Sequence, residues 1–384
     1  NDIFENHGAL IEEKFPKLNR CLTGYDLAHI RDEKGLFNLN SVLCGSEGSL
    51  GFIAEATLNV LPIPKYAALV NIKYDSFESS MRDAKELMNW QPTSIETIDS
   101  KVLNLAMNDI VWESVTDYFE ATEGTTEALD IQGINLVEYT GDNEAELDDK
   151  IAKLTEYLTS VAGQNGKSFG FNVVKGAQNI NKVWAMRKKS VGLLGNGVGQ
   201  ERPIPFVEDT AVPPENLADF IMEFRAVLDS YQLPYGMFGH VDAGVLHVRP
   251  AIDMKDPQQA ALIRPITDKV VALTQKYNGL LWGEHGKGVR SEYAPAFFGE
   301  LYVQLQRIKG CFDPHNQLNP GKIATPVAEQ KAIKAIASEQ LIASDKLASD
   351  DGLLKVDQVP TRGDYDRTIS SSARDAFSEA MFCN

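Results

Sequence analysis

The alternation of short apolar runs with amphipathic segments from residue 66 onward most constrains what this chain can fold into. Residues 67–74, AALVNIKY, have the length and apolar content of a strand. Residues 143–162 instead carry apolar side chains three and four positions apart, which is typical of a helix. These side chains are Leu147, Ile151, Leu154, Leu158 and Val161. Because such pairs recur along the chain, the sequence predicts an α+β fold in which surface helices interleave with the strands.

Two boundaries follow from local composition. Residues 51–63, GFIAEATLNVLPI, alternate apolar and polar side chains and predict a further strand. The PIPK run at 62–65 ends that strand, because proline cannot donate to a strand ladder, and it predicts a domain boundary. Beyond about residue 325 the sequence is rich in Ala, Ser and Lys, which predicts an exposed helix or a linker.

Charge and cysteine content exclude several functions. The net charge of -17 argues against a nucleic-acid partner, because such binding depends on neutralising phosphates. No apolar run approaches the length of a membrane span, and we expect no secretory leader. The four cysteines are scattered, which favours free thiols and a cytoplasmic location. They are Cys21, Cys44, Cys311 and Cys383.

The stretch GHVDAGVLHVRP, residues 239–250, holds two of the six histidines, His240 and His247. They are seven positions apart, so a straight strand would point the two rings to opposite faces. A turn at 242–244 would change that parity and let both rings converge as ligands for a divalent metal. The alternative is that both are half-buried strand residues with backbone partners. Taken alone, the stretch favours this alternative.

The stretch LLWGEHGKGVRSEY, residues 280–293, places Glu284 and His285 side by side among glycines. Adjacent residues on an extended chain face opposite ways, so one could serve a metal while the other faces a second reactant. Two histidines and one carboxylate would leave coordination positions open, as catalytic metal sites do. An exposed Glu–His pair in a glycine-rich turn is the other interpretation.

Two further stretches are turns. Residues 43–53, LCGSEGSLGFI, could bring backbone N–H groups against a phosphate or a flat ring, but composition alone is also compatible with an ordinary turn. Residues 312–323, FDPHNQLNPGKI, predict a rigid turn because of their proline and glycine residues.

Together, the motifs at 45–58, 239–250, 283–293 and 318–323 resemble one known family in order and spacing. The chain resembles the FAD-linked oxidases of the vanillyl-alcohol-oxidase type, in the D-2-hydroxyacid dehydrogenase branch, over about residues 20–325. Within that branch it is most similar to the long bacterial proteins that contain FAD and an iron–sulfur segment and oxidise D-2-hydroxyglutarate. The resemblance implies a C-terminal part of an FAD domain and an antiparallel-sheet substrate domain with surface helices. D-lactate and glycolate dehydrogenases of the same family are the alternatives.

The resemblance also implies roles for individual residues. His240, His247 and Glu284 would ligate a divalent metal, with zinc expected. His285 would be the base that takes the substrate's hydroxyl proton, and the hydride would pass to FAD. Arg187 would bind the substrate's first carboxylate, and a second carboxylate would need a further arginine. The candidates for that second role are Arg249, Arg202 and Arg290. The expected flavin contacts are Gly45, Ser46, Glu47, Gly48, Gly51, Ile53 and Asn319.

The family pattern predicts a division into four parts: 1–64, the remainder of an FAD-binding domain; 65–299, the substrate domain; 300–325, a return segment; and 326–384, a linker. Cys383 would be the first ligand of a 4Fe-4S cluster. Because no pyrophosphate-binding loop precedes residue 45, we expect the chain to be a fragment with weak or no activity alone. Val245 and Arg249 stand where the family commonly has Asn.

Other assignments remain open. A flavin-independent metallohydrolase built on the same histidines is a competing hypothesis. So is a structural or interaction module. The sequence does not specify the electron acceptor or the oligomeric state. Peripheral attachment to the inner membrane is the alternative to a purely cytoplasmic location.

Overall fold

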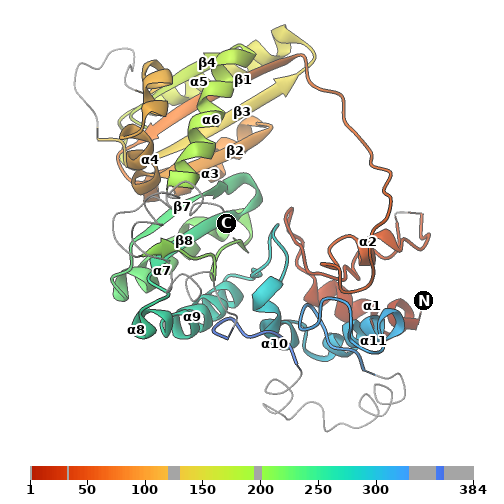
Figure 1. Cartoon of the computed structure of the whole chain (residues 1–384). Coiled ribbons are helices and arrows are strands. Elements are labelled where there is room, and N and C mark those ends of the chain that lie inside the picture. The colour runs from red at the N-terminus through yellow and green to blue at the C-terminus, as the bar shows by residue number, and fades with distance from the viewer. Residues whose placement is uncertain (1, 33, 120–129, 194–200, 328–351, 359–384) are drawn as a thin grey trace. The chain divides into compact units, whose positions relative to one another are not determined.

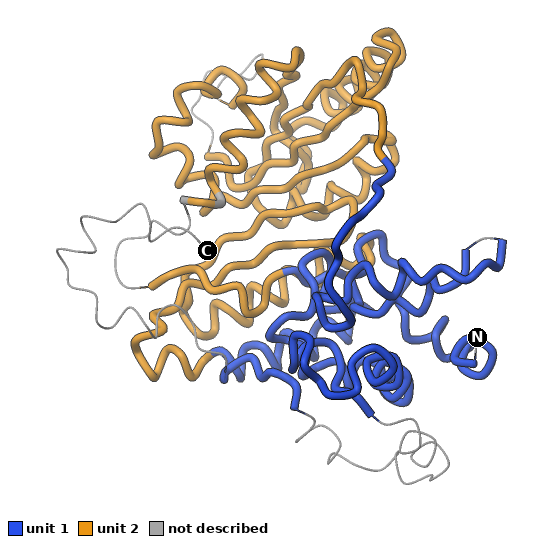
Figure 2. Tube along the Cα trace, turned by 45° about the vertical axis from the view of Figure 1, so that its right-hand side comes forward, with its two compact units in different colours: residues 1–59, 209–211, 263–360 blue, residues 60–208, 212–262, 361–384 orange. Residues whose placement is uncertain are grey.

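The computed structural model describes residues 2–32, 34–119, 130–193, 201–327 and 352–358. The chain divides into two compact units, coloured separately in Figure 2. Unit 1 contains residues 1–59, 209–211 and 263–360, and unit 2 contains residues 60–208, 212–262 and 361–384.

Unit 2 is built on an antiparallel sheet whose strand order is β4-β1-β3-β2-β7-β8-β5 (Figure 1). In that order the strands are Gly170–Lys175, Tyr66–Tyr74, Gly133–Gly141, Ser94–Asp99, Tyr235–His240, Val245–Ile252 and Arg202–Pro203. The helices of unit 2 are α3 (Phe77–Leu87), α4 (Ser100–Met107), α5 (Glu144–Val161), α6 (Ala177–Leu193), α7 (Leu217–Ser230) and α8 (Pro257–Ala260). The sheet and its helices confirm the predicted α+β class.

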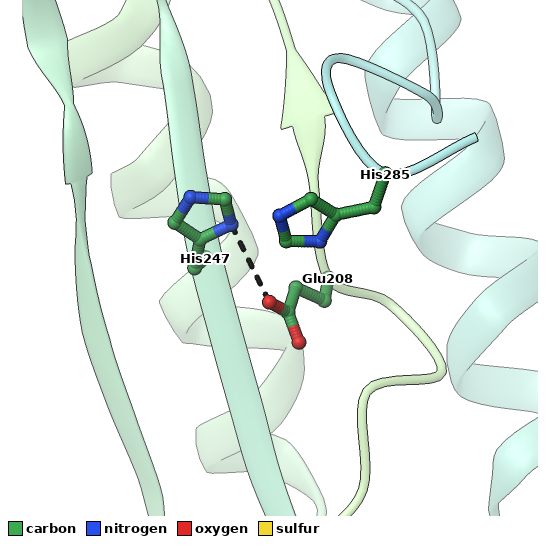
Figure 3. Close-up of side chains that lie close together, drawn as sticks. All are labelled: Glu208, His247 and His285. Atoms are coloured by element: carbon green, nitrogen blue, oxygen red, sulfur yellow. Dashed lines mark ion pairs between the residues drawn. The ribbon is translucent and has the colours of Figure 1, made fainter. Parts of the chain in front are cut away.

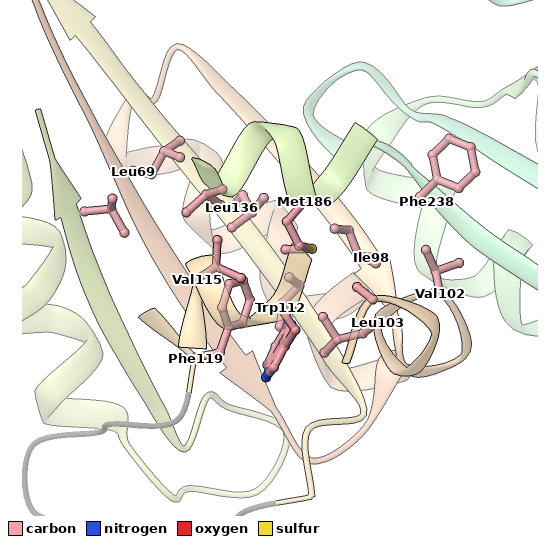
Figure 4. Close-up of a cluster of buried hydrophobic side chains, with 14 of the residues drawn as sticks. Leu69, Ile98, Val102, Leu103, Trp112, Val115, Phe119, Leu136, Met186 and Phe238 are labelled. Atoms are coloured by element: carbon pink, nitrogen blue, oxygen red, sulfur yellow. The ribbon is translucent and has the colours of Figure 1, made fainter. Parts of the chain in front are cut away.

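One face of this sheet is covered by α4 and α6, which bury the cluster drawn in Figure 4. Leu69, Ile98 and Leu136 come from three neighbouring strands, and Val183 and Met186 come from α6. Each is at most 1% exposed. Burying one such side chain stabilises a fold by about 1.5–3 kcal/mol, so this cluster fixes the strands that carry the residues described below.

Local signals explain the helices of unit 2. The helix predicted over 143–162 is confirmed as α5, with Leu147, Ile151, Leu154 and Leu158 buried. Asn143 caps it by accepting the N–H of Ala145. Asp99 caps α4 in the same way, accepting the N–H of Val102 at 2.8 Å.

Unit 1 is mostly helical. Its elements are α1 (Asp2–Lys14), α2 (Asn40–Leu43), β6 (Thr210–Ala211), α9 (Ile263–Lys276), η7 (Gly288–Tyr293), α10 (Ala294–Phe298), η8 (Gly299–Leu301) and α11 (Tyr302–Phe312). In the described part of the chain, no helix is both long and apolar enough to cross a bilayer.

The strand predicted over 51–63 is wrong. These residues have no regular secondary structure, and Phe52 and Leu61 are each 90% exposed. Alternating apolar and polar side chains suit a strand, but a strand forms only where its backbone can hydrogen-bond to a neighbouring strand. Among the described residues, none pairs with this segment. In residues 280–286 the strand pairing is limited to one bridge, between Ala211 and Leu280.

Candidate functional site

The two histidines of the 239–250 stretch lie on one face of the sheet in unit 2. They flank the short turn η6 (Val241–Ala243), and His247 lies directly across from Phe238 in the β7–β8 pairing. Because Phe238 and His240 are two residues apart on β7, they share a face, and His247 joins them. The two imidazole centroids are 5.5 Å apart, with the rings perpendicular.

The turn between the histidines depends on Gly244. Its φ is +71°, and a Cβ at this position would lie 1.8 Å from the carbonyl oxygen of Val212. Only glycine accepts both the left-handed conformation and that approach. This glycine therefore sets the parity that brings both rings to one face.

A buried carboxylate on β2 contacts the first histidine. The pairing of β2 with β7 places Glu96 opposite His240, and its carboxylate contacts the Nδ1 atom of that ring. Arg187 of α6 donates from Nη2 to Glu96 Oε2 at 2.7 Å. Burial acts to raise the pKa of Glu96, but hydrogen bonding from His240 and the charge of Arg187 outweigh it and hold that pKa below its ordinary value.

A second buried carboxylate repeats this arrangement. Arg249 donates from Nε and Nη2 to the two oxygens of Glu208, both at 2.9 Å. His247 Nδ1 lies 3.4 Å from Glu208 Oε1, the ion pair drawn in Figure 3. Burial acts to raise the pKa of Glu208, but the nearby His247 ring and the hydrogen bonds from Arg249 lower it to about 2.

The ring of Phe238 supports both arginines. The guanidinium carbons of Arg187 and Arg249 lie 5.0 Å and 5.7 Å from its centroid, and the His247 ring lies 5.2 Å away. Cations held over an aromatic face gain about 0.5–2 kcal/mol each. Unit 2 therefore presents two oriented cations and two imidazoles on one sheet face.

Unit 1 holds the Glu284–His285 pair on a buried aspartate. The carboxylate of Asp209 accepts the backbone N–H of Glu284 at 2.8 and 3.0 Å and that of His285 at 2.9 Å. Burial raises the pKa of Asp209, although donation from His285 opposes the shift. Asp209, Glu284 and His285 each offer a ligand atom within 4.8 Å of the others. Arg20 forms an ion pair with Glu284 at 2.6 Å.

The glycine-rich turn at 43–53 also meets this loop within unit 1. Glu47, at a φ of +53°, accepts the backbone N–H groups of Lys287 at 2.6 Å and Gly288 at 2.9 Å. Asn319 donates from Nδ2 to the carbonyl oxygen of Glu47 at 2.6 Å. Three of the four quoted motifs are therefore joined by hydrogen bonds in unit 1.

The remaining expected flavin contacts lie along the same turn. Gly45 and Gly48 have φ angles of +117° and +69°, which suit glycine. Ser46 is buried, whereas Gly51 is partly exposed and Ile53 is 78% exposed.

The other predicted residues are distributed as follows. Arg290 is buried in η7 of unit 1, where its charge acts on Asp209. Arg202 lies in β5 of unit 2 and donates to the carbonyl oxygen of Glu201. Cys383 lies outside the described residues.

Sequence reasoning assigned no role to Glu96, Glu208, Asp209 or Phe238. Glu208 and Asp209 stand in the run PIPFVEDTAV, where two adjacent acids among apolar residues were the available signal. Glu96 gave no local signal, because only the register of β2 on β7 places it beside His240.

The chain is similar to known proteins in sequence and in fold. Residues 63–323 match the family described as FAD linked oxidases, C-terminal domain. A D-2-hydroxyglutarate dehydrogenase of Pseudomonas putida is 59% identical over 383 residues, which is 100% of this chain and 36% of that protein. The Escherichia coli protein of the same name is 51% identical over 378 residues, 98% of this chain and 35% of that protein. The chain thus spans about a third of the length of these relatives.

A solved structure supports the fold alone. The chain is similar to 4-ethylphenol oxidase from Gulosibacter chungangensis, with a TM-score of 0.50 and 14% identity over 71% of this chain and 56% of that one. The family match covers most of the described residues, including both histidines and the Glu284–His285 pair. The chain belongs to the FAD-linked oxidases and contains their C-terminal domain.

Proposed function

We propose that this chain is part of an enzyme that oxidises D-2-hydroxyglutarate to the 2-oxo acid, with FAD as the hydride acceptor. The observation that carries the proposal is the pair of arginines, Arg187 and Arg249, held over Phe238 beside two histidines. Relatives that are 48–59% identical and bear this enzyme's name point the same way.

The two arginines favour a dicarboxylate. A guanidinium recognises a carboxylate through two parallel hydrogen bonds, and D-2-hydroxyglutarate has one carboxylate for each arginine. Arg187 would take the carboxylate beside the hydroxyl group, and Arg249 the distal one. D-lactate and glycolate have a single carboxylate and would leave one arginine without a substrate partner. A D-lactate dehydrogenase is nevertheless among the relatives, at 26% identity, so this substrate remains the second candidate.

The donor set fits a divalent metal, and we propose zinc. Both imidazoles turn Nδ1 toward a carboxylate, and we assign the ligand role to Nε2. His240, His247 and Glu284 would hold the ion, which supplies a Lewis acid for the substrate's hydroxyl group. His285, whose backbone is fixed by Asp209, would accept the hydroxyl proton.

The turn at 43–53 fits a flat cofactor. Its positive-φ residues form a tight turn, and Glu47 and Asn319 are already fixed by hydrogen bonds. We propose that Gly45, Ser46, Glu47, Gly48, Gly51, Ile53 and Asn319 contact FAD, which supplies the hydride acceptor when bound. Cys383 remains a proposed ligand of a 4Fe-4S cluster, and a cytoplasmic location also stays a proposal.

Substrate binding tests the proposal directly. We expect isothermal titration of the zinc-loaded chain to detect D-2-hydroxyglutarate, and Arg249→Gln to weaken it by at least about tenfold, because a charged hydrogen-bond pair contributes about 1.5–3 kcal/mol. D-lactate is the matched ligand, and its affinity should change little in the same variant. Equal losses for both acids, or tighter binding of D-lactate by the unaltered chain, would refute the assignment of a dicarboxylate substrate.

A further inference from the structure

Two buried glutamates of unit 2 have the same set of partners. Glu96 contacts His240 Nδ1 and accepts a hydrogen bond from Arg187, and Glu208 lies at His247 Nδ1 and accepts two hydrogen bonds from Arg249. Their side chains are only 9% and 3% exposed. A carboxylate removed from water needs such partners, since otherwise its burial costs several kcal/mol.

The contact with Nδ1 determines what each imidazole can do. A neutral imidazole carries one proton, and a carboxylate beside Nδ1 holds that proton on Nδ1. The lone pair is then on Nε2, the nitrogen that faces away from the carboxylate. A carboxylate in this position also fixes the ring's orientation and makes Nε2 a stronger donor to a metal ion.

The two carboxylates come from unrelated parts of the chain. Glu96 is carried by β2, and Glu208 lies two residues before β6. Each histidine therefore has its own carboxylate. Each glutamate also fixes the arginine that lies over the Phe238 ring.

We propose that Glu96 and Glu208 are positioning residues for a divalent metal ion, each orienting one histidine so that Nε2 binds the ion. This inference rests on the metal site of the proposed function and assigns the residues that organise it. Loss of either carboxylate lowers the affinity for the ion without removing a ligand.

Zinc affinity provides the first test. The variants are Glu96→Gln and Glu208→Gln, with Glu138→Gln as the matched control, because Glu138 lies on the neighbouring strand β3 and bonds to Ser94 rather than to a histidine. Competition against a chromophoric chelator should give about 10–100-fold weaker zinc binding for the first two variants and no change for the control. The double variant His240→Ala/His247→Ala identifies zinc held elsewhere on the chain.

Nitrogen NMR of the unaltered chain keeps the test independent of how the variants fold. In protein labelled with 15N-histidine, we expect two imidazoles to keep a proton on Nδ1 and to show the shift of Nε2 on adding zinc. Zinc binding through Nδ1, or unchanged affinity in both glutamine variants, overturns the inference alone. A chain that binds no zinc at all overturns both the inference and the metal site of the proposed function.

Discussion

The substitution Gly244→Ala isolates the turn that brings His240 and His247 to one face. An alanine at a φ of +71° costs about 1–2 kcal/mol, because its Cβ clashes with its own backbone. The added Cβ would also lie 1.8 Å from the Val212 carbonyl oxygen, so the backbones at Val212 and Gly244 must move apart. Overpacking of this kind costs about 1–3 kcal/mol more. We therefore expect the free energy of unfolding to fall by about 2–5 kcal/mol.

A second glycine of unit 2 provides the matched control. Gly176 has a φ of +86°, but a Cβ there would meet no atom within 4 Å. Gly176→Ala should therefore cost only the backbone strain of about 1–2 kcal/mol. Urea unfolding compares the two variants, and hydrogen exchange over residues 235–252 should rise only in Gly244→Ala. Equal losses of stability in both variants would show that the Val212 contact does not constrain this turn.

Three further changes test the charged residues. Asp209→Asn replaces the carboxylate that accepts the backbone N–H groups of Glu284 and His285 with a neutral amide. Hydrogen exchange at these two residues should therefore rise, while Asn216→Ala, the control, leaves it unchanged. The pKa of Glu208 is lowered from 4.5 to about 2 in the folded chain. The stability that this shift contributes is therefore present above about pH 4.5 and is lost as the pH falls toward 2. Acid titration of Glu208→Gln should not show this loss of stability. Burial lowers the pKa of Lys287 from 10.5 to about 7, so the unfolded chain binds more protons than the folded chain between these pH values. Lys287→Met should therefore raise the urea midpoint of unfolding near pH 7 but not above pH 10.5.

Each of these three predictions has a result that would contradict it. Unchanged exchange at 284–285 in Asp209→Asn would mean that the Glu284–His285 loop is held by other contacts. An identical acid transition in Glu208→Gln would mean that Arg249 and His247 do not stabilise the carboxylate. A uniform effect of Lys287→Met at every pH would indicate a packing change rather than removal of a buried charge, and Lys150→Met on the surface of α5 is the control.

Sequence patterns predicted those elements, such as helix α5, that are determined by residues close together in the chain. Helix α5 follows from the spacing of its apolar residues, and its start follows from the cap at Asn143. The segment 51–63 has an equally clear period, yet it forms no strand, because pairing depends on an edge that a local pattern cannot supply. The same limit hid Glu96, which acquires its partner only through the register between β2 and β7.

The motifs and the family resemblance identified residues that the structure gathers within each unit. Glu47 is hydrogen-bonded to the 284–288 loop and to Asn319, although both lie more than 200 residues further along the chain. No local periodicity in the sequence predicts such contacts. Phe238 was missed for a different reason, since an aromatic residue in a strand is ordinarily a core residue, and here it is also the support for two arginines.

The double role of Phe238 has a practical consequence for protein engineering. Phe238 belongs to the core cluster that includes Val102 and Met186, and its ring also lies beside the guanidinium groups of Arg187 and Arg249. Any change in how tightly that core is filled will therefore shift the positions of both guanidinium groups. For the proposed function, a search for variants that bind a shorter or longer hydroxy acid should begin with position 238 and the residues behind it, leaving the arginines themselves in place.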